Sequence, residues 1–312
     1  MSTFRAIFAT VFASLLLAAC GGGSGIQSVA PPAPQSAFST SSSRTVADEG
    51  YTIHILPPLH AGRALPVLSL PETGRTAQSL SGALQWHRGP VQHNPKLYVI
   101  FWGSKWSATN SVYKTTLNFF NGLKASRWNG TVTQYYDSKA HVANDIALAG
   151  AWIDTAAAVP LHPATGQVGA EAERGVSHFG FHGTDANYVV AIEQGHDPSG
   201  FASSWCAWHS DEYKTGVGEI SFTNLPYMPD GGADCGSGAV NYPGINDGVS
   251  IVGGHEVAET ETDPQPDSGW RDVNDNEVGD LCAWFDLQET SFSTGHFPTQ
   301  PLYSDAAGAC VQ

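Results

Sequence analysis

Short apolar runs in the second two-thirds of the chain predict a fold that mixes strands and helices. Residues 96–102 form a continuous β-branched and aromatic run between a proline and a glycine, which is typical of a buried strand. Residues 188–192 form a second such run, and residues 219–223 are a third candidate strand. Between the first two runs, apolar residues recur at helical spacing over 109–124, which predicts an amphipathic helix.

A longer helix is predicted over residues 247–261. Apolar residues and carboxylates recur there at helical spacings, and Asp263-Pro264 ends the run because a residue before proline avoids the helical conformation. Gly253 and Gly254 each cost about 1 kcal/mol in a helix, so we expect another element to approach them closely. The order strand, helix, strand, long helix predicts an α+β (or α/β) fold. We expect one zincin-like globular domain over 88–312, with a central sheet.

The N-terminal residues read as a targeting segment. An apolar stretch ends in Leu17-Ala18-Ala19-Cys20, which resembles a bacterial lipobox with cleavage before Cys20 and a lipid on its thiol. The alternative is an ordinary secretory signal. We expect a signal peptide over 1–19, a Gly/Ser/Pro-rich tether over 20–50, and an extended or partly disordered lead-in over 51–87. This predicts a protein of the bacterial cell envelope, held to the membrane by its lipid, and in the outer membrane if the host has two.

Composition narrows the range of partners. The chain has 312 residues, 41% of them hydrophobic, so it can bury a large core. Its formal net charge is −15 with only 14 Lys and Arg. Nucleic-acid binding needs clustered basic residues, so the sequence predicts no nucleic-acid partner.

Four cysteines follow the lipobox: Cys206, Cys235, Cys282 and Cys310. An even number in an exported chain predicts two disulfides, for which three pairings exist. Cys206–Cys235 and Cys282–Cys310 are favoured because each closes a loop of about 30 residues. No CxxC pair is present, which argues against a zinc site made of cysteines.

The predicted long helix contains His255-Glu256-Val257-Ala258-Glu259, one residue away from the zinc-protease signature HExxH. His255 and Glu259 lie four apart, so on a helix they share one face and are suited to bind one divalent metal. Glu256 is then placed to act as a base on a metal-bound water. The competing interpretation is an accidental match on an acidic helix.

A third metal ligand is expected downstream. Glu277 and Asp280 lie 18 and 21 residues beyond Glu259, a separation similar to that of the third ligand in thermolysin-like proteases, and the spacing does not choose between them. One histidine with two carboxylates is an oxygen-rich set, which favours Zn and leaves Mn or Ca open. His209 is a second catalytic candidate, to stabilise an oxyanion or position substrate. The alternative is a structural histidine beside the cysteine at 206.

Several short motifs follow one another between residues 88 and 310. They are Arg88-Gly89-Pro90-Val91 followed by Leu97 to Gly103, Tyr188-Val189-Val190 followed by Cys206-Ala207-Trp208-His209, His255 to Glu259 followed by Thr262-Asp263-Pro264, Glu277 to Cys282, and Cys310. In these motifs and their order the chain resembles the EXORDIUM/phosphate-induced protein family. Arg88 replaces the family's first glycine, residues 137–188 match nothing in it, and the plant members lack the lipobox.

The resemblance implies a secreted protein, since the plant family is linked to growth responses of the cell wall. It also implies that Glu256 and the four predicted ligands form one site, and it supports the pairing of Cys282 with Cys310. Two functions are expected from the sequence. The first is a lipid-anchored zinc hydrolase, metallopeptidase-like, acting on a peptide or cell-wall substrate. The second is a non-catalytic envelope protein whose metal is structural or absent, with Trp205 and Trp208 exposed to stack on glycans.

Overall fold

A seven-stranded mixed sheet forms the centre of the fold. The computed structural model describes residues 44–59 and 84–312, so the predicted signal peptide, most of the tether and the lipidation site Cys20 lie outside the described residues. In spatial order the strands are β1 (Thr45–Asp48), β2 (Tyr51–Leu56), β7 (Ala207–Lys214), β8 (Gly218–Leu225), β6 (Ala186–Ile192), β4 (Lys96–Trp102) and β5 (Ala147–Asp154).

The sheet has a parallel half and an antiparallel half. Strands β8, β6, β4 and β5 run parallel, with Tyr98 of β4 opposite Tyr188 of β6. Strand β7 is antiparallel to β8 and to β2, and β2 is antiparallel to β1. Parallel strands need long crossovers. The helices α1 (Ser111–Gly122) and α2 (Thr165–Phe179) lie in the crossovers from β4 to β5 and from β5 to β6.

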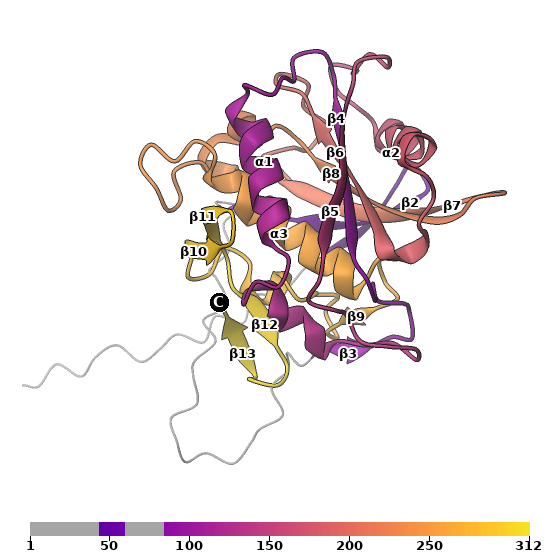
Figure 1. Ribbon diagram of the computed structural model, residues 1–312, viewed down its shortest axis with the longest axis vertical. Coiled ribbons are helices and arrows are strands. Elements are labelled where there is room, and N and C mark those ends of the chain that lie inside the picture. The colour runs from indigo at the N-terminus through magenta and orange to yellow at the C-terminus, as the bar shows by residue number, and fades with distance from the viewer. Residues whose placement is uncertain (1–43, 60–83) are drawn as a thin grey trace, which may run out of the picture. The chain divides into compact units, whose positions relative to one another are not determined.

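Alternate residues of the parallel strands build two cores, one on each face of the sheet. On β4, Val99 and Phe101 pack with α1 and with α3 (Asp247–Thr262), whereas Ile100 and Trp102 pack with α2. Figure 1 shows α1 and α3 on one side of the sheet and α2 on the other. Because both faces are covered, these strands read as continuous apolar runs rather than as alternating patterns.

The sequence predicted these central elements well. The mixed fold with a central sheet is confirmed, and β4, β6, β8 and α1 fall on the predicted runs. The predicted long helix is α3, and all sixteen of its residues are buried. The close approach expected at its glycines is also present. A Cβ at Gly254 would lie 3.0 Å from the Phe119 ring and 3.2 Å from the Trp128 ring.

The predicted boundary between the N-terminal segments and the folded domain needs correction. The tether was expected to reach residue 50 and the lead-in to reach residue 87, but β1 and β2 of the main sheet lie within these two segments. Strand β3 (Gln85–Trp86) also precedes residue 88 and pairs with β9 (Trp270–Arg271). The sequence 51–56 pairs with β7, and this partner is too distant along the chain to be recognised from a local pattern.

Smaller elements complete the fold. They are the hairpins β10 (Gln288–Phe292) with β11 (Gly295–Thr299) and β12 (Leu302–Ser304) with β13 (Ala309–Val311), and the 3-10 turns η1 (Asn129–Gln134), η2 (Gly183–Asp185), η3 (Met228–Cys235) and η4 (Asp280–Cys282). Both predicted disulfides are confirmed, with S–S distances of 2.08 Å for Cys206–Cys235 and 1.99 Å for Cys282–Cys310. Within the described part of the chain, no helix has the length and apolar character needed to cross a membrane.

Candidate metal centre

Three histidines and four carboxylates meet between α3 and the antiparallel half of the sheet. Helix α3 supplies His255, Glu256 and Glu259 to this cluster. His54 of β2 and His209 of β7 are direct cross-strand partners in the sheet, and their ring centroids lie 5.5 Å apart. Neighbouring residues of these strands, Ile53 and Trp208, belong to the core on the opposite face. Side chains alternate across a strand, so the two imidazoles point toward α3.

The nitrogen and oxygen atoms of the cluster lie at spacings that suit a shared metal. His255 Nε2 is 3.0 Å from Glu259 Oε1 and 3.7 Å from Asp280 Oδ1. His209 Nδ1 is 3.2 Å from Glu256 Oε2 and 3.8 Å from Glu259 Oε2. Two ligand atoms on one tetrahedral zinc ion are separated by roughly 3.3 Å. The spacing predicted for a histidine and a carboxylate one helical turn apart is therefore present.

A tight turn brings the downstream carboxylates to the helix. The Asp280 N–H donates to Glu259 Oε1 at 3.1 Å, and the Glu277 N–H donates to Asp280 Oδ2 at 3.0 Å. Gly279 makes this approach sterically feasible, because a Cβ there would lie 2.6 Å from His255 Nδ1 and 3.0 Å from Glu259 Oε1. The Cys282–Cys310 disulfide ties the same turn to β13.

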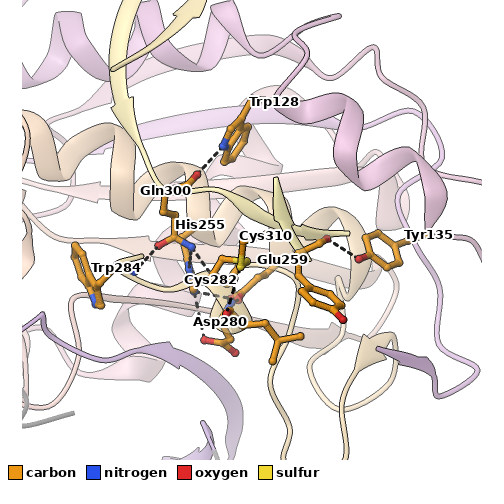
Figure 2. The surroundings of a disulfide bond; sticks show 12 residues. Trp128, Tyr135, His255, Glu259, Asp280, Cys282, Trp284, Gln300 and Cys310 are labelled. Carbon is orange, nitrogen blue, oxygen red and sulfur yellow. Dashed lines mark hydrogen bonds and ion pairs between the residues drawn. A yellow bond between two sulfur atoms is a disulfide. The ribbon is translucent and has the colours of Figure 1, made fainter. Parts of the chain in front are cut away.

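Gln300 holds His255 from the side away from the carboxylates. Figure 2 shows the Gln300 side chain between His255 and Trp284, beside the Cys282–Cys310 disulfide. Its amide nitrogen lies 3.1 Å from His255 Nδ1 and donates to the Gly279 carbonyl at 2.7 Å. The Trp128 indole N–H donates to the Gln300 backbone carbonyl at 2.7 Å. The orientation of the imidazole is thus fixed by a buried polar chain.

Asp280 has two cationic or potentially cationic neighbours. Arg44 Nη1 lies 2.7 Å from Asp280 Oδ1, and His54 Nε2 lies 2.6 Å from Asp280 Oδ2. Burial alone would raise the pKa of Asp280, but the charges of Arg44 and His54 outweigh it and lower the pKa. Burial would likewise lower the pKa of His54, yet the charge and hydrogen bond of Asp280 raise it.

For Glu256, Glu277 and His209 the effect of burial prevails. Burial, and then the charges of Glu259 and Asp280, raise the pKa of Glu256 well above its usual value. Burial, and then the charges of Asp263 and Glu259, do the same to the pKa of Glu277. Burial, followed by the charges of His54 and His255, lowers the pKa of His209 well below its usual value. A bound cation would oppose the raised pKa of the two carboxyl groups and reinforce the lowered pKa of His209, because it favours ionised carboxylates and neutral imidazoles.

Unpaired polar atoms give an independent sign that the cluster fits a cation. Within the cluster, the buried side-chain atoms without a hydrogen-bond partner among the described residues are His209 Nε2, His255 Nε2, Glu256 Oε1, Glu259 Oε2, Glu277 Oε1 and Oε2, and Asp280 Oδ1, the last of which lies 2.7 Å from Arg44 Nη1. Buried polar atoms are paired almost everywhere in folded proteins, because an unpaired one costs about 1–3 kcal/mol. Imidazole nitrogens and carboxylate oxygens are the donors that first-row divalent metals prefer, so these residues fit such an ion.

The structure brings together all six residues predicted for the site. His255, Glu256, Glu259, Glu277, Asp280 and His209 lie in this one cluster. Whether each of them binds metal or acts in catalysis stays a prediction. The sequence interpretation missed His54 and Arg44. The run Tyr-Thr-Ile-His-Ile-Leu at 51–56, between a glycine and two prolines, carried the strand signal that would have drawn attention to His54.

The site is closed within the described part of the molecule. His209, His255, Glu256, Glu259 and Glu277 are each 0% exposed. The expected exposure of Trp205 and Trp208 is wrong, since they are 8% and 1% exposed and pack in the core on the α2 face. These two rings therefore offer no open platform for a glycan.

Comparisons of the chain with known proteins identify no relative. No protein-family model, no curated protein and no solved structure matches the chain. The resemblance to the EXORDIUM family therefore stays a prediction from the sequence motifs.

Proposed function

We propose that this protein is a metal-binding protein of the cell envelope, whose buried cluster between α3 and strands β2 and β7 holds a divalent transition metal. The observation that carries the proposal is that Glu256 and Glu259 each have an unpaired, fully buried carboxylate oxygen and lie in one group of possible ligands with His209. A buried carboxylate without a cation or a hydrogen bond is strongly destabilising. Zinc fits the mixture of imidazole and carboxylate ligands best. Manganese, a harder Lewis acid that prefers oxygen ligands, is the alternative.

The burial of the site favours a metal that stabilises the fold. Its candidate ligands come from β2, β7, α3 and the turn at 277–280, and one ion bound by His54, Glu259 and Asp280 would connect three of these segments. In such a site the free energy of metal binding becomes free energy of folding. Anchoring through a lipid on Cys20 and a zincin-like fold remain part of this proposal as inferences from the sequence alone.

A hydrolase is the second candidate, favoured by the position of Glu256. Its Oε1 is buried and unpaired, and its Oε2 lies 3.2 Å from His209 Nδ1. The metal would polarise a scissile carbonyl, Glu256 Oε1 would accept a proton from the attacking water, and His209 would position that carboxylate. A peptide or cell-wall amide is the substrate class that this chemistry suits.

Metal content and metal-dependent stability test the first candidate. The full chain, stripped with a chelator, should gain several degrees of thermal stability when Zn²⁺ or Mn²⁺ is restored, because the ion binds only the folded state. The Glu259→Gln variant should gain much less. Glu171→Gln is the matched control, because Glu171 is also buried but packs on the other side of the sheet. A wild-type protein that neither retains nor responds to either metal contradicts the proposal.

Amide hydrolysis by the metal-loaded protein tests the second candidate. Loss of a general base costs typically 10²–10⁴-fold in rate. In this second candidate Glu256 is the general base and not a metal ligand, so Glu256→Gln should abolish hydrolysis of a peptide library while the number of bound ions is unchanged. If the wild-type protein binds metal but cleaves nothing in peptide or peptidoglycan screens, only the first candidate stands.

A further inference from the structure

The donor atoms of the cluster fall into two groups rather than one. His54, Glu259 and Asp280 each offer a ligand atom, and these three atoms lie within 4.8 Å of one another. His209, Glu256 and Glu259 form a second group under the same criterion. Glu259 is common to both.

The two oxygens of Glu259 face the two groups separately. Oε1 accepts the N–H of Asp280 at 3.1 Å and lies 3.0 Å from His255 Nε2. Oε2 is unpaired and lies 3.8 Å from His209 Nδ1. A carboxylate with one oxygen directed to each group has the arrangement of a bridging ligand between two ions, which in two-metal sites lie about 3.5–4 Å apart.

A second carboxylate, Glu277, lies between the two strand histidines. Its Oε1 is 3.2 Å from His54 Nδ1, and its Oε2 is 3.7 Å from His209 Nε2. Each imidazole therefore has one nitrogen toward Glu277 and the other toward the ligand groups. A histidine that ligates a metal commonly donates its remaining N–H to a carboxylate, which fixes the ring and its tautomer.

We propose that the cluster is a dinuclear centre in which Glu259 bridges two divalent first-row transition ions. The first ion is held by His54, His255 and Asp280 with one oxygen of Glu259. The second is held by His209 and Glu256 with the other oxygen. Glu277 orients both strand histidines and binds neither ion, and Asp280 rather than Glu277 completes the predicted ligand set.

This inference rests on the proposed function and is tested by stoichiometry. The stripped full chain is titrated with Zn²⁺, and bound metal is counted by mass spectrometry after gel filtration. Two ions per chain are expected for the wild type, and one for His209→Ala or Glu256→Gln. Glu277→Gln should keep two ions with about 10–100-fold weaker binding, the usual effect of losing an outer hydrogen-bond partner. His93→Ala, which removes a half-buried histidine paired with Asp137 outside the cluster, should keep two.

The possible counts separate the two proposals. One ion in the wild type overturns the dinuclear centre and leaves the metal-binding function standing, whereas no ion overturns both. Two ions in Glu256→Gln would show that Glu256 is not a ligand and would overturn the assignment of the second ion. Electron paramagnetic resonance of the Mn²⁺-loaded wild-type protein is a second test, and it does not depend on whether any variant folds. An exchange-coupled spectrum supports the pair, and the six-line signal of isolated Mn²⁺ at full loading contradicts it.

Discussion

Glu277 and Asp280 lie three residues apart in one buried turn, yet the pKa values of their carboxyl groups are shifted in opposite directions. Asp280 faces Arg44 and His54, which hold its pKa low against the effect of burial. Glu277 is buried and then faces the negative charges of Asp263 and Glu259, so its pKa is raised. The neighbours of a buried acid therefore decide its charge. In the proposed metal centre, this excess of acids favours a bound cation.

On the α2 face, a second pair of buried acids shows how an excess of buried carboxyl groups can be accommodated when one of them keeps its proton. Asp154 and Glu171 are each 1% exposed, and both contact Arg174. Burial, and then the hydrogen bond and charge of Asp154, raise the pKa of Glu171 to about 8. One guanidinium carries a single positive charge and cannot neutralise two buried carboxylates. Glu171 therefore retains its proton, and Asp154 carries the negative charge.

This pair predicts a pH dependence of stability. The pKa of Glu171 is near 4.5 when unfolded and about 8 when folded, so between these values the folded state binds the extra proton. Its contribution is complete below about pH 4.5 and is lost as pH rises through 8, by at most about 1.4 kcal/mol per pH unit. Glu171→Gln should flatten the decline in unfolding free energy between pH 6 and pH 8.5, measured by urea denaturation. The exposed Glu289→Gln is the control, and an unchanged slope in Glu171→Gln would refute the argument.

At the scale of elements, α3 is a helix maintained by its surroundings. All its residues are buried, and it contains two consecutive glycines as well as valines, an isoleucine and threonines, which are weak helix formers. Its packing against α1, β7, β8 and β11 compensates for this low propensity. Each glycine of α3 can therefore be judged by what its side chain would touch.

The two glycines should respond differently to alanine. At Gly253 a Cβ would meet Phe120 at 3.4 Å, an ordinary contact, so Gly253→Ala should stabilise the protein by up to about 1 kcal/mol through helix propensity. At Gly254 a Cβ would lie 3.0 Å from Phe119, which is 0% exposed and has little room to move. Gly254→Ala should therefore destabilise the protein by roughly 1–3 kcal/mol, the usual effect of overpacking. Urea midpoints of the two variants provide the measurement, and equal midpoints would contradict this distinction.

Prediction of the elements from sequence succeeded where the pattern is local. Strand β4 and helix α3 each carry a long, uniform signal, and both were located to within a residue or two. His255 and Glu259 are also a local pair, since one helical turn separates them. His54 could not be placed in the site in this way. Its position depends on β2 pairing with β7, and that contact between distant segments is decided by the whole sheet.

At the scale of the whole molecule, the two disulfides constrain different parts of the fold. Cys206–Cys235 connects the residue before β7 with η3, and Cys282–Cys310 connects η4 with β13. His209 is held independently of its nearby disulfide, because it pairs with Thr223 of β8 and His54 of β2. Asp280 lies in η4, a turn of three residues that has no such sheet partners among the described strands and ends at Cys282.

The two disulfides should therefore have equal effects on stability and unequal effects on metal binding. Their sequence separations are 29 and 28 residues, so replacing either pair by serine should lower the unfolding free energy by a similar amount, about 3 kcal/mol. Only Cys282→Ser/Cys310→Ser loosens the turn that carries Asp280, so its Zn²⁺ affinity should fall by at least tenfold, while Cys206→Ser/Cys235→Ser keeps affinity near that of the wild type. Calorimetric titration at a temperature where both variants are folded makes the comparison. Equal loss of affinity in both would mean that the metal centre depends on general stability, and the role assigned to the 277–282 turn would be wrong.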